Sequence, residues 1–156
     1  MGRGVSTCGV CDGAFFKDRS TMVIGGGDSA MEDAVFVSKF ASSLDLVHRR
    51  DEFRASKIMQ ERAEQQPNIT LRTPWAPEAF LPGEDGALEK VQLKNSESGD
   101  LEEVPVDGVF IAIGHVPRSE LVVGQVDTDE EGYVITDPAS TKTKLAGVFA
   151  VGDLVD

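Results

Sequence analysis

The sequence contains few of the patterns that mark membrane, secreted or nucleic-acid-binding proteins. No run of about 18 apolar residues occurs, so we expect no membrane-spanning helix. The first residues contain no apolar signal segment, which predicts a cytoplasmic protein rather than a secreted one. There are only 15 basic residues against 27 acidic ones, and the resulting formal charge of −12 argues against nucleic acid as a partner.

Cysteine and histidine are also scarce. The two cysteines, Cys8 and Cys11, lie three positions apart, and the two histidines, His48 and His115, are far from them in the sequence. A zinc site needs two more ligands at metal-ligand spacing, and these histidines do not have that spacing. In a chain without a signal segment, the Cys-x-x-Cys pair favours redox chemistry over a structural disulfide, an inert buried thiol pair or half of a zinc site.

The residues around the cysteines are typical of a reactive disulfide. Cys8-Gly9-Val10-Cys11 can close a small ring. When such a pair opens a short helix, the helix N–H groups stabilise the thiolate and lower the thiol pKa. Asp12 follows directly and can exchange the proton that each dithiol–disulfide interchange requires.

Hydrophobic periodicity predicts a βαβ unit in residues 20–47. Residues 22–24 form an apolar, β-prone run that leads into three glycines, and a second short strand is expected at 44–47. Between them, small apolar residues recur at helical spacings of three and four: Ala30, Ala34, Val37 and Ala41. A strand, a glycine-rich turn, a helix and a strand in about 30 residues imply a parallel sheet with a right-handed crossover.

The following residues extend this sheet and add a second one. Residues 53–64 are amphipathic and predict a helix, and residues 69–73 predict a third parallel strand. Turn signals separate three further strand candidates, which predicts an antiparallel meander of residues 75–81, 87–94 and 101–106. Residues 109–113 are apolar throughout, as expected for a strand buried on both faces. The predicted fold is therefore α/β, a Rossmann-like parallel sheet with an antiparallel three-stranded β-meander.

The chain changes character after Gly114. We expect residues 1–114 to form a nucleotide-binding domain that carries the Cys-x-x-Cys motif, whereas residues 115–156 are rich in loops. Only residues 134–135 and 148–151 are strand candidates in that second part. These elements are too few for a separate core, so we expect residues 115–156 to pack against another part of a larger protein.

The segment Gly25-Gly26-Gly27-Asp28-Ser29-Ala30 matches the dinucleotide-binding fingerprint. In that motif the first glycine allows a tight turn, the second (Gly27) lets the backbone approach a pyrophosphate, and Ala30 lets the helix pack close to the sheet. The helix N-terminus presents free N–H groups and a positive dipole end to the phosphates. Its place between a strand and an amphipathic helix favours dinucleotide binding over a purely structural glycine turn.

The residues after the second strand predict which dinucleotide binds. An NAD site places an acidic residue about 20 residues after the glycines, at the ribose 2′-hydroxyl. This chain instead has His48-Arg49-Arg50, followed by Arg54. A 2′-phosphate carries nearly two negative charges, which guanidinium groups match in charge and geometry. We therefore predict NADPH rather than NADH, and prefer this reading to that of a merely solvated basic loop.

Together these motifs resemble those of the low-molecular-weight, bacterial-type thioredoxin reductases. The resemblance is carried, in order and at similar spacing, by residues 6–13, 23–30, 48–54, 112–115 and 147–153. It implies NADPH-dependent thioredoxin-disulfide reductase activity in a homodimer. In such enzymes NADPH reduces FAD, the flavin reduces the Cys-x-x-Cys disulfide, and the resulting dithiol reduces thioredoxin.

The resemblance also implies roles for individual residues. Cys8 and Cys11 would be the redox pair and Asp12 the proton donor. The NADPH-binding residues would be Gly25, Gly27, Asp28, Ser29, Ala30, Glu32, His48, Arg49, Arg50, Arg54, Ile113 and Gly114. Of these, Asp28 and Ser29 would lie near the pyrophosphate and Glu32 near the nicotinamide. Gly152 and Asp153 would contact FAD in the full-length enzyme, and no residue is assigned to a metal.

Two departures from the family pattern affect these expectations. The dipeptide between the cysteines is Gly9-Val10, where the family often has Ala-Thr, and this change should shift the redox potential slightly. The FAD-binding fingerprint expected before Cys8 and the helix expected after Asp153 are both missing, so we expect a fragment that is inactive without the FAD domain. By the same resemblance, residues 115–156 would be the return segment of a truncated FAD-binding domain. The alternatives are a stand-alone NADPH-binding module or redox sensor and, third, a zinc-containing structural module.

Overall fold

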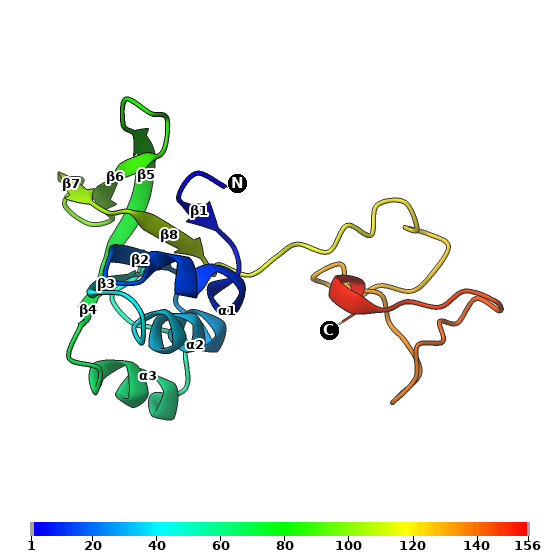
Figure 1. Ribbon diagram of the computed structural model, residues 1–156. Helices are drawn as coiled ribbons and strands as arrows, with labels where there is room; N and C mark the ends of the chain where they lie inside the picture. Colours follow the sequence, from blue (N-terminus) through cyan, green and yellow to red (C-terminus); the bar gives the residue numbers. More distant parts are fainter. Residues whose placement is uncertain (1, 156) are drawn as a thin grey trace. The chain divides into compact units, whose positions relative to one another are not determined.

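The computed structural model describes residues 2–155, and the chain forms two compact units. The first unit, Met1–Ile113, contains the two β-sheets and the helices, and the second unit, Gly114–Asp156, consists mostly of loops (Figure 1). This division falls one residue before the boundary predicted from the sequence. The assignment of the second unit to an FAD-binding domain stays a prediction.

The first unit is built on a parallel sheet of five strands. Their order across the sheet is β1 (Val5–Ser6), β8 (Gly108–Ile111), β2 (Ser20–Ile24), β3 (Ser43–Val47) and β4 (Ile69–Arg72). In the register of the central strands, Ile24 lies opposite both Ile111 and Val47, so β8, β2 and β3 end level with one another. Their carboxyl ends therefore form one edge of the sheet, where ligands of open α/β sheets bind.

Two helices, α2 (Asp28–Val37) and α3 (Lys57–Glu64), cover one face of this sheet (Figure 1). The small apolar residues of α2 are fully buried and pack against Phe110 and the side chains that β2 and β3 direct to this face. Helix α2 ends at Val37, earlier than the predicted periodicity, although Ala41 is still buried in the same core.

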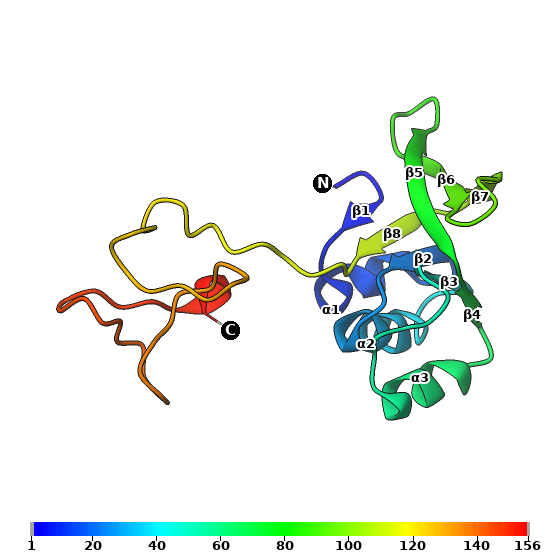
Figure 2. The ribbon, with the colours of Figure 1, turned by 180° about the vertical axis from the view of Figure 1, so that it is seen from behind.

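The opposite face of the sheet is covered by the predicted meander, as both ribbon views show (Figures 1 and 2). Its strands are β5 (Trp75–Pro82), β6 (Leu88–Asn95) and β7 (Leu101–Pro105), all antiparallel. Their inward side chains form a second core with residues of the parallel sheet, which comprises Met22, Ile24, Val47, Val91, Leu93, Val104, Val106 and Val109. The predicted α/β fold is thus confirmed, including the three-stranded meander.

An ion-pair cluster joins the meander to the parallel sheet. Arg72 of β4 lies with its Nε 3.1 Å from an Asp45 oxygen on β3 and its Nη1 3.0 Å from a Glu102 oxygen on β7. All three side chains are partly buried, so water and salt screen the attraction between their charges less than they would at a fully exposed site. This cluster fixes the meander above the strands that carry the ligand-binding edge.

Two elements predicted from the sequence have different boundaries. The helix predicted at 53–64 begins only at Lys57, because the preceding residues form an ordered loop. The strand predicted at 109–113 ends at Ile111, and its burial on both faces holds for Val109 and Phe110 but not for Ile113, which is 68% exposed. The chain leaves the sheet after the Ala112 N–H donates a hydrogen bond to the Ile24 carbonyl oxygen (2.8 Å).

The second unit has no strands within residues 114–155, so the strands predicted at 134–135 and 148–151 are wrong. Isolated bridges, Thr128 with Val134 and Lys142 with Phe149, replace them. Contrary to expectation, this unit does have a small buried cluster of its own, formed by Val126, Val134 and Ala150. Over the whole described chain, no helix has the length and apolarity needed to cross a membrane.

Candidate functional site

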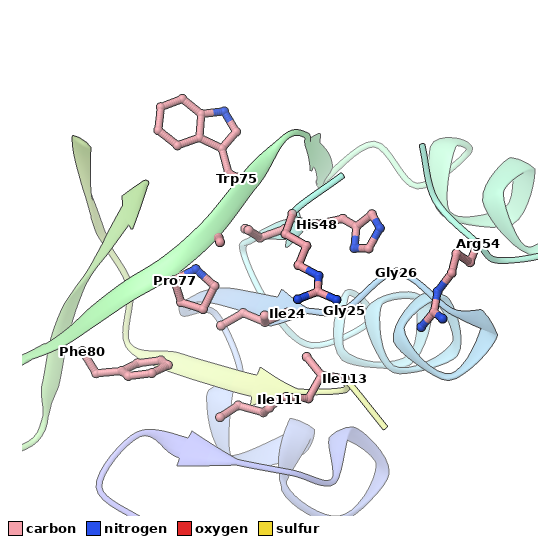
Figure 3. A pocket seen from close by; sticks show the side chains of 13 residues that line it. Ile24, Gly25, Gly26, His48, Arg54, Trp75, Pro77, Phe80, Ile111 and Ile113 are labelled. Carbon is pink, nitrogen blue, oxygen red and sulfur yellow. The ribbon is translucent and has the colours of Figure 1, made fainter. Parts of the chain in front are cut away.

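A cavity of about 490 Å³ opens at the carboxyl edge of the parallel sheet. Figure 3 shows Gly25, Gly26, His48 and Arg54 on one side of it and Trp75 and Phe80 of the meander on the other. The remaining lining residues come from strand ends, the residues that follow them and the start of β5: Ile24, Val47, Arg49, Ala76, Pro77, Ile111 and Ile113. An apolar floor with cationic groups on one rim suits a ligand that has both a flat apolar part and a charged part.

The three consecutive glycines between β2 and α2 serve different purposes. A Cβ at Gly25 would collide with the Ala112 carbonyl oxygen and lie 2.7 Å from the Ala30 Cβ, so this glycine allows β8 and α2 to approach closely. Gly27 has no neighbouring atom within 4 Å of such a Cβ, and its backbone is open to a ligand. The N-terminus of α2 begins directly after it, as the fingerprint predicts.

The loop of residues 48–56 follows β3 and carries the arginines. Main-chain hydrogen bonds fix both of its ends. At the start, the His48 N–H donates to the Arg72 carbonyl oxygen (3.0 Å). At the end, the N–H groups of Arg54 and Ala55 both donate to the Gly26 carbonyl oxygen, at 2.7 and 3.0 Å. Both of these last two bonds therefore attach the arginine loop to one peptide group of the glycine loop.

The three arginine side chains of this loop, Arg49, Arg50 and Arg54, are exposed. Within residues 2–155, none of them takes part in an ion pair with a carboxylate of the chain. Arg49 and Arg54 line the cavity next to the glycine loop. Their charges are thus available to an anionic ligand, and their assignment to a 2′-phosphate stays a prediction.

His48 is only 7% exposed and supports the loop from beneath. Its ring stacks on Phe53, with centroids 5.4 Å apart, and occupies the space that a Cβ at Gly26 would take. Burial lowers the pKa of His48, and the nearby charges of Arg50, Arg54 and Arg49 lower it further. His48 is therefore neutral at neutral pH, and its Nε2 has no hydrogen-bond partner among the described residues.

Cys8 and Cys11 form a disulfide at the start of the short helix α1 (Gly9–Asp12), with their Cα atoms 5.3 Å apart. Cys8 is the N-cap residue, and its Sγ accepts a hydrogen bond from the Cys11 N–H (3.1 Å). Cys11 is exposed and Cys8 partly so, which excludes the reading as a buried, inert thiol pair. No group of residues suited to a metal ion is found in the described part of the chain.

Ser6 is a residue of this region that sequence reasoning missed. Its hydroxyl donates to an Asp12 carboxylate oxygen (2.6 Å) and accepts a hydrogen bond from the Cys8 N–H (3.1 Å). It thereby holds the predicted proton-transfer group against the first turn of α1. The only signal in the sequence is a serine two residues before a helix N-cap, a position where hydroxyls often bond to local backbone.

Asp33 was also missed, and it lies where α2 meets α1. A Cβ at Gly9 would be 2.5 Å from an Asp33 oxygen, so the absence of a side chain at Gly9 lets the two helices touch. Burial raises the pKa of Asp33, a hydrogen bond from the Gly9 N–H opposes this, and Glu32 adds to the rise. The helix that begins at the glycine loop is therefore in direct contact with the disulfide segment.

The other predicted residues lie on the surface of these elements. On α2, Asp28, Ser29 and Glu32 are exposed, and an Asp28 oxygen accepts a hydrogen bond from the Ser56 N–H (2.6 Å). Gly114 follows the cavity residue Ile113 directly and has a φ of +84°. The residues predicted for FAD, Gly152 and Asp153, are exposed in the short 3-10 helix η2 (Gly152–Leu154) of the second unit.

Comparisons with known proteins agree with this geometry. All of the chain, residues 1–156, matches the pyridine nucleotide-disulphide oxidoreductase family. The chain is 54% identical over 155 residues to a thioredoxin reductase of Streptomyces coelicolor, and the aligned region covers 99% of the chain and 48% of that protein. It is also 50% identical over 159 residues to a bifunctional thioredoxin reductase/thioredoxin of Mycobacterium leprae, and this aligned region covers 100% of the chain and 34% of that protein.

Among solved structures, the thioredoxin reductase of Lactococcus lactis (FR conformation) is similar with a TM-score of 0.84 and 42% sequence identity. The similarity covers 98% of this chain and 50% of that one. The chain thus spans about half the length of the Streptomyces and Lactococcus proteins that it matches.

Proposed function

Because the chain belongs to the pyridine nucleotide-disulphide oxidoreductase family, we propose that it is the NADPH-binding and disulfide-bearing part of a thioredoxin-disulfide reductase. The family resemblance predicted from the sequence is confirmed by the match over the whole chain. The observation that carries the proposal is that a glycine-loop cavity and the Cys8–Cys11 disulfide lie in one compact unit, connected by α2.

We propose that NADPH binds at the cavity, with its charged groups next to residues of complementary charge or free N–H groups. The pyrophosphate would lie over Gly27 and the first turn of α2, near Asp28 and Ser29, where N–H groups are free to donate. The 2′-phosphate would be held by the exposed guanidinium groups of the arginine loop: Arg49, Arg50 and Arg54. Further contacts are proposed for Gly25, Ala30, His48, Ile113 and Gly114, and for Glu32 at the nicotinamide end.

FAD is the second cofactor that the family implies. When bound, it supplies the two-electron chemistry that connects the nicotinamide to the disulfide. Gly152 and Asp153 are the residues proposed to contact it. They fit this role in one respect, because Gly152 is exposed at a φ of +70° with no atom within 4 Å of a Cβ position, so its backbone is open to a ligand.

The reduced cysteine pair would act on thioredoxin by thiol–disulfide exchange. One thiolate attacks a sulfur of the partner disulfide, the partner S–S bond breaks, and a mixed disulfide forms with release of a partner thiolate. The second cysteine then attacks the mixed disulfide, which restores the Cys8–Cys11 bond and releases the partner as a dithiol. Asp12 is proposed to exchange the protons of these steps, and its hydrogen bond from Ser6, which also binds the Cys8 N–H, supports this role.

Thioredoxin as the partner is supported by the Mycobacterium leprae relative, a bifunctional thioredoxin reductase/thioredoxin that joins both in one protein. We further infer a cytoplasmic homodimer for the full-length protein, on the family resemblance. The formal charge of −12 supports a protein that binds neither nucleic acid nor anionic membrane surfaces. A stand-alone redox sensor is not favoured, since the similar proteins are named as reductases.

The nucleotide assignment is tested by replacing Arg49 and Arg50 with alanine and measuring NADPH and NADH binding by titration calorimetry. We expect NADPH binding to weaken by about 1.5–3 kcal/mol for each charged hydrogen bond lost, with NADH binding almost unchanged. Arg62→Ala, on the exposed side of α3, is the matched loss of a positive charge and should change neither affinity. Equal losses for both nucleotides would contradict the assignment.

A further inference from the structure

The carboxylate of Asp28 joins two elements that are distant in the sequence. Asp28 is the first residue of α2, and its Oδ1 accepts a hydrogen bond from the backbone N–H of Ser56 at 2.6 Å. Ser56 is the N-cap residue of α3, and its own side chain makes no capping hydrogen bond. In a capping box, an acidic side chain of the same helix accepts the N–H of the N-cap residue. Here Asp28 of a different helix has that function.

This contact continues the attachment of the arginine loop to the glycine loop. The Gly26 carbonyl oxygen accepts the N–H groups of Arg54 and Ala55, and Asp28 accepts the N–H of the next residue, Ser56. Three successive N–H groups of the arginine loop are therefore held by two residues of the glycine-rich segment. The direction in which the Arg54 side chain leaves the backbone is set by these bonds.

The earlier part of the arginine loop rests on buried side chains. His48 is packed between Phe53 and the backbone of Gly26, next to the cavity (Figure 3). This packing leaves the end of the loop, near Ser56, as the part that depends on Asp28. Since the Asp28 hydrogen bond is exposed, its removal should loosen that end without opening a core.

A simpler explanation for Asp28 would be its charge. An acidic side chain in the first turn of a helix is stabilised by the helix dipole, whatever it contacts. However, this is also the helix end at which the pyrophosphate is proposed to bind, where a negative charge opposes the ligand. The hydrogen bond to Ser56 gives a reason for an oxygen acceptor at this position that does not require the charge.

We propose that Asp28 is a positioning residue for 2′-phosphate recognition, which acts by holding the arginine loop rather than by contacting the nucleotide. This inference rests on the proposed NADPH site and assigns to Asp28 a role in selectivity. The oxygen acceptor of the side chain is what this role requires, and its charge is dispensable.

The test uses two probes that differ only in the phosphate, 2′-phospho-ADP-ribose and ADP-ribose, with the 156-residue chain in a titration calorimeter. Asp28→Ala should lower the preference for the phosphorylated probe by about tenfold, because the arginine side chains are no longer held in place. Asp28→Asn keeps an oxygen acceptor and should keep the preference, while binding both probes at least as tightly as the natural chain. Glu64→Ala, a matched loss of charge at the other end of α3, should leave the preference unchanged.

A second variant removes the donor instead of the acceptor. Ser56 has a φ of −59°, which proline adopts, so Ser56→Pro deletes the N–H with little change in backbone direction. It should lower the preference as much as Asp28→Ala does, and the double variant should lose no more than either single one. Circular dichroism spectra of all variants check that the helical content of the chain is retained.

The possible results separate the two proposals. If the natural chain does not prefer 2′-phospho-ADP-ribose, the NADPH assignment itself is wrong, and the role of Asp28 falls with it. If the natural chain is selective but Asp28→Ala is equally selective, or loses affinity equally for both probes, only the positioning role is overturned. The same conclusion follows if Asp28→Asn behaves like Asp28→Ala.

Discussion

The two units of the chain differ in how they bury their apolar residues. In the first unit, helices on one face of the sheet and the meander on the other create two cores with fully buried side chains, among them Phe110 and Leu93. The second unit has one small cluster around Val134, and many of its large apolar side chains are exposed, such as Leu121 at 88%. The proposed nucleotide and disulfide sites thus lie on a unit with its own core, whereas the second unit leaves more of its large apolar side chains exposed.

The largest effect is expected when one phenylalanine is removed from each unit. Phe110→Ala empties the centre of a fully buried core and should cost about 3–5 kcal/mol of unfolding free energy. Phe149→Ala, at a side chain that is 61% exposed, should change it by about 0.5 kcal/mol or less. A urea titration followed by the amide NMR signals of each unit measures both effects. Similar losses in the two units would show that the second unit is as well packed as the first.

A smaller effect is expected within the first unit, at the glycine loop. A Cβ at Gly26 would collide with the buried ring of His48, so Gly26→Ala should destabilise the fold by about 1–3 kcal/mol. Gly27→Ala meets no atom within 4 Å and should cost less than about 1 kcal/mol, although its methyl group would face the proposed pyrophosphate. Thermal unfolding separates the two variants, and equal melting temperatures would rule out the packing of His48 on Gly26.

The smallest expected effect is a pH dependence from His48. Because burial and three arginines lower its pKa in the folded protein, the unfolded chain binds a proton more readily. The stability contributed by neutral His48 is therefore fully present above the ordinary histidine pKa of about 6.5 and is lost as the pH falls below that value. Chemical unfolding at pH values from about 7.5 to 5 should show this decline in the natural chain.

The variant His48→Gln isolates that contribution. It does not titrate, so its stability should fall less steeply over the same pH range than that of the natural chain. The difference between the two curves removes the effects of all other groups that titrate in this range. Two parallel curves would mean that His48 is protonated as easily in the folded protein as in the unfolded chain.

Much of the fold could be predicted because its signals are local. The glycine fingerprint, the periodicity of α2 and the turns of the meander each depend on residues close in the sequence. The start of α3 could not be predicted in this way. Phe53 fits a helical pattern, but in the structure its ring stacks on His48, so its apolar character reflects a contact within a loop. Ile113, likewise, is apolar because it lines the cavity and not because it lies in a buried strand.

The candidate site was predicted by residue type but not by the way its parts are connected. The cysteines, the glycines and the arginines stand out in the sequence, whereas Ser6, Asp33 and the contact of Asp28 with Ser56 do not. Asp28 and Ser56 are 28 positions apart, and nothing in either local sequence indicates that they meet. Such contacts depend on the approach of α2 and α3, which only the packed fold determines.

The double hydrogen bond at the Gly26 carbonyl oxygen has a consequence for how coenzyme choice can be altered. Its donors are the backbone N–H groups of Arg54 and Ala55, which are present whatever side chains these positions carry. The path of the loop is therefore largely independent of the side chains proposed to contact the ribose. Exchanging the arginines for acidic residues should convert the coenzyme preference while the backbone stays as it is, which makes this loop a suitable place to redesign the protein for NADH.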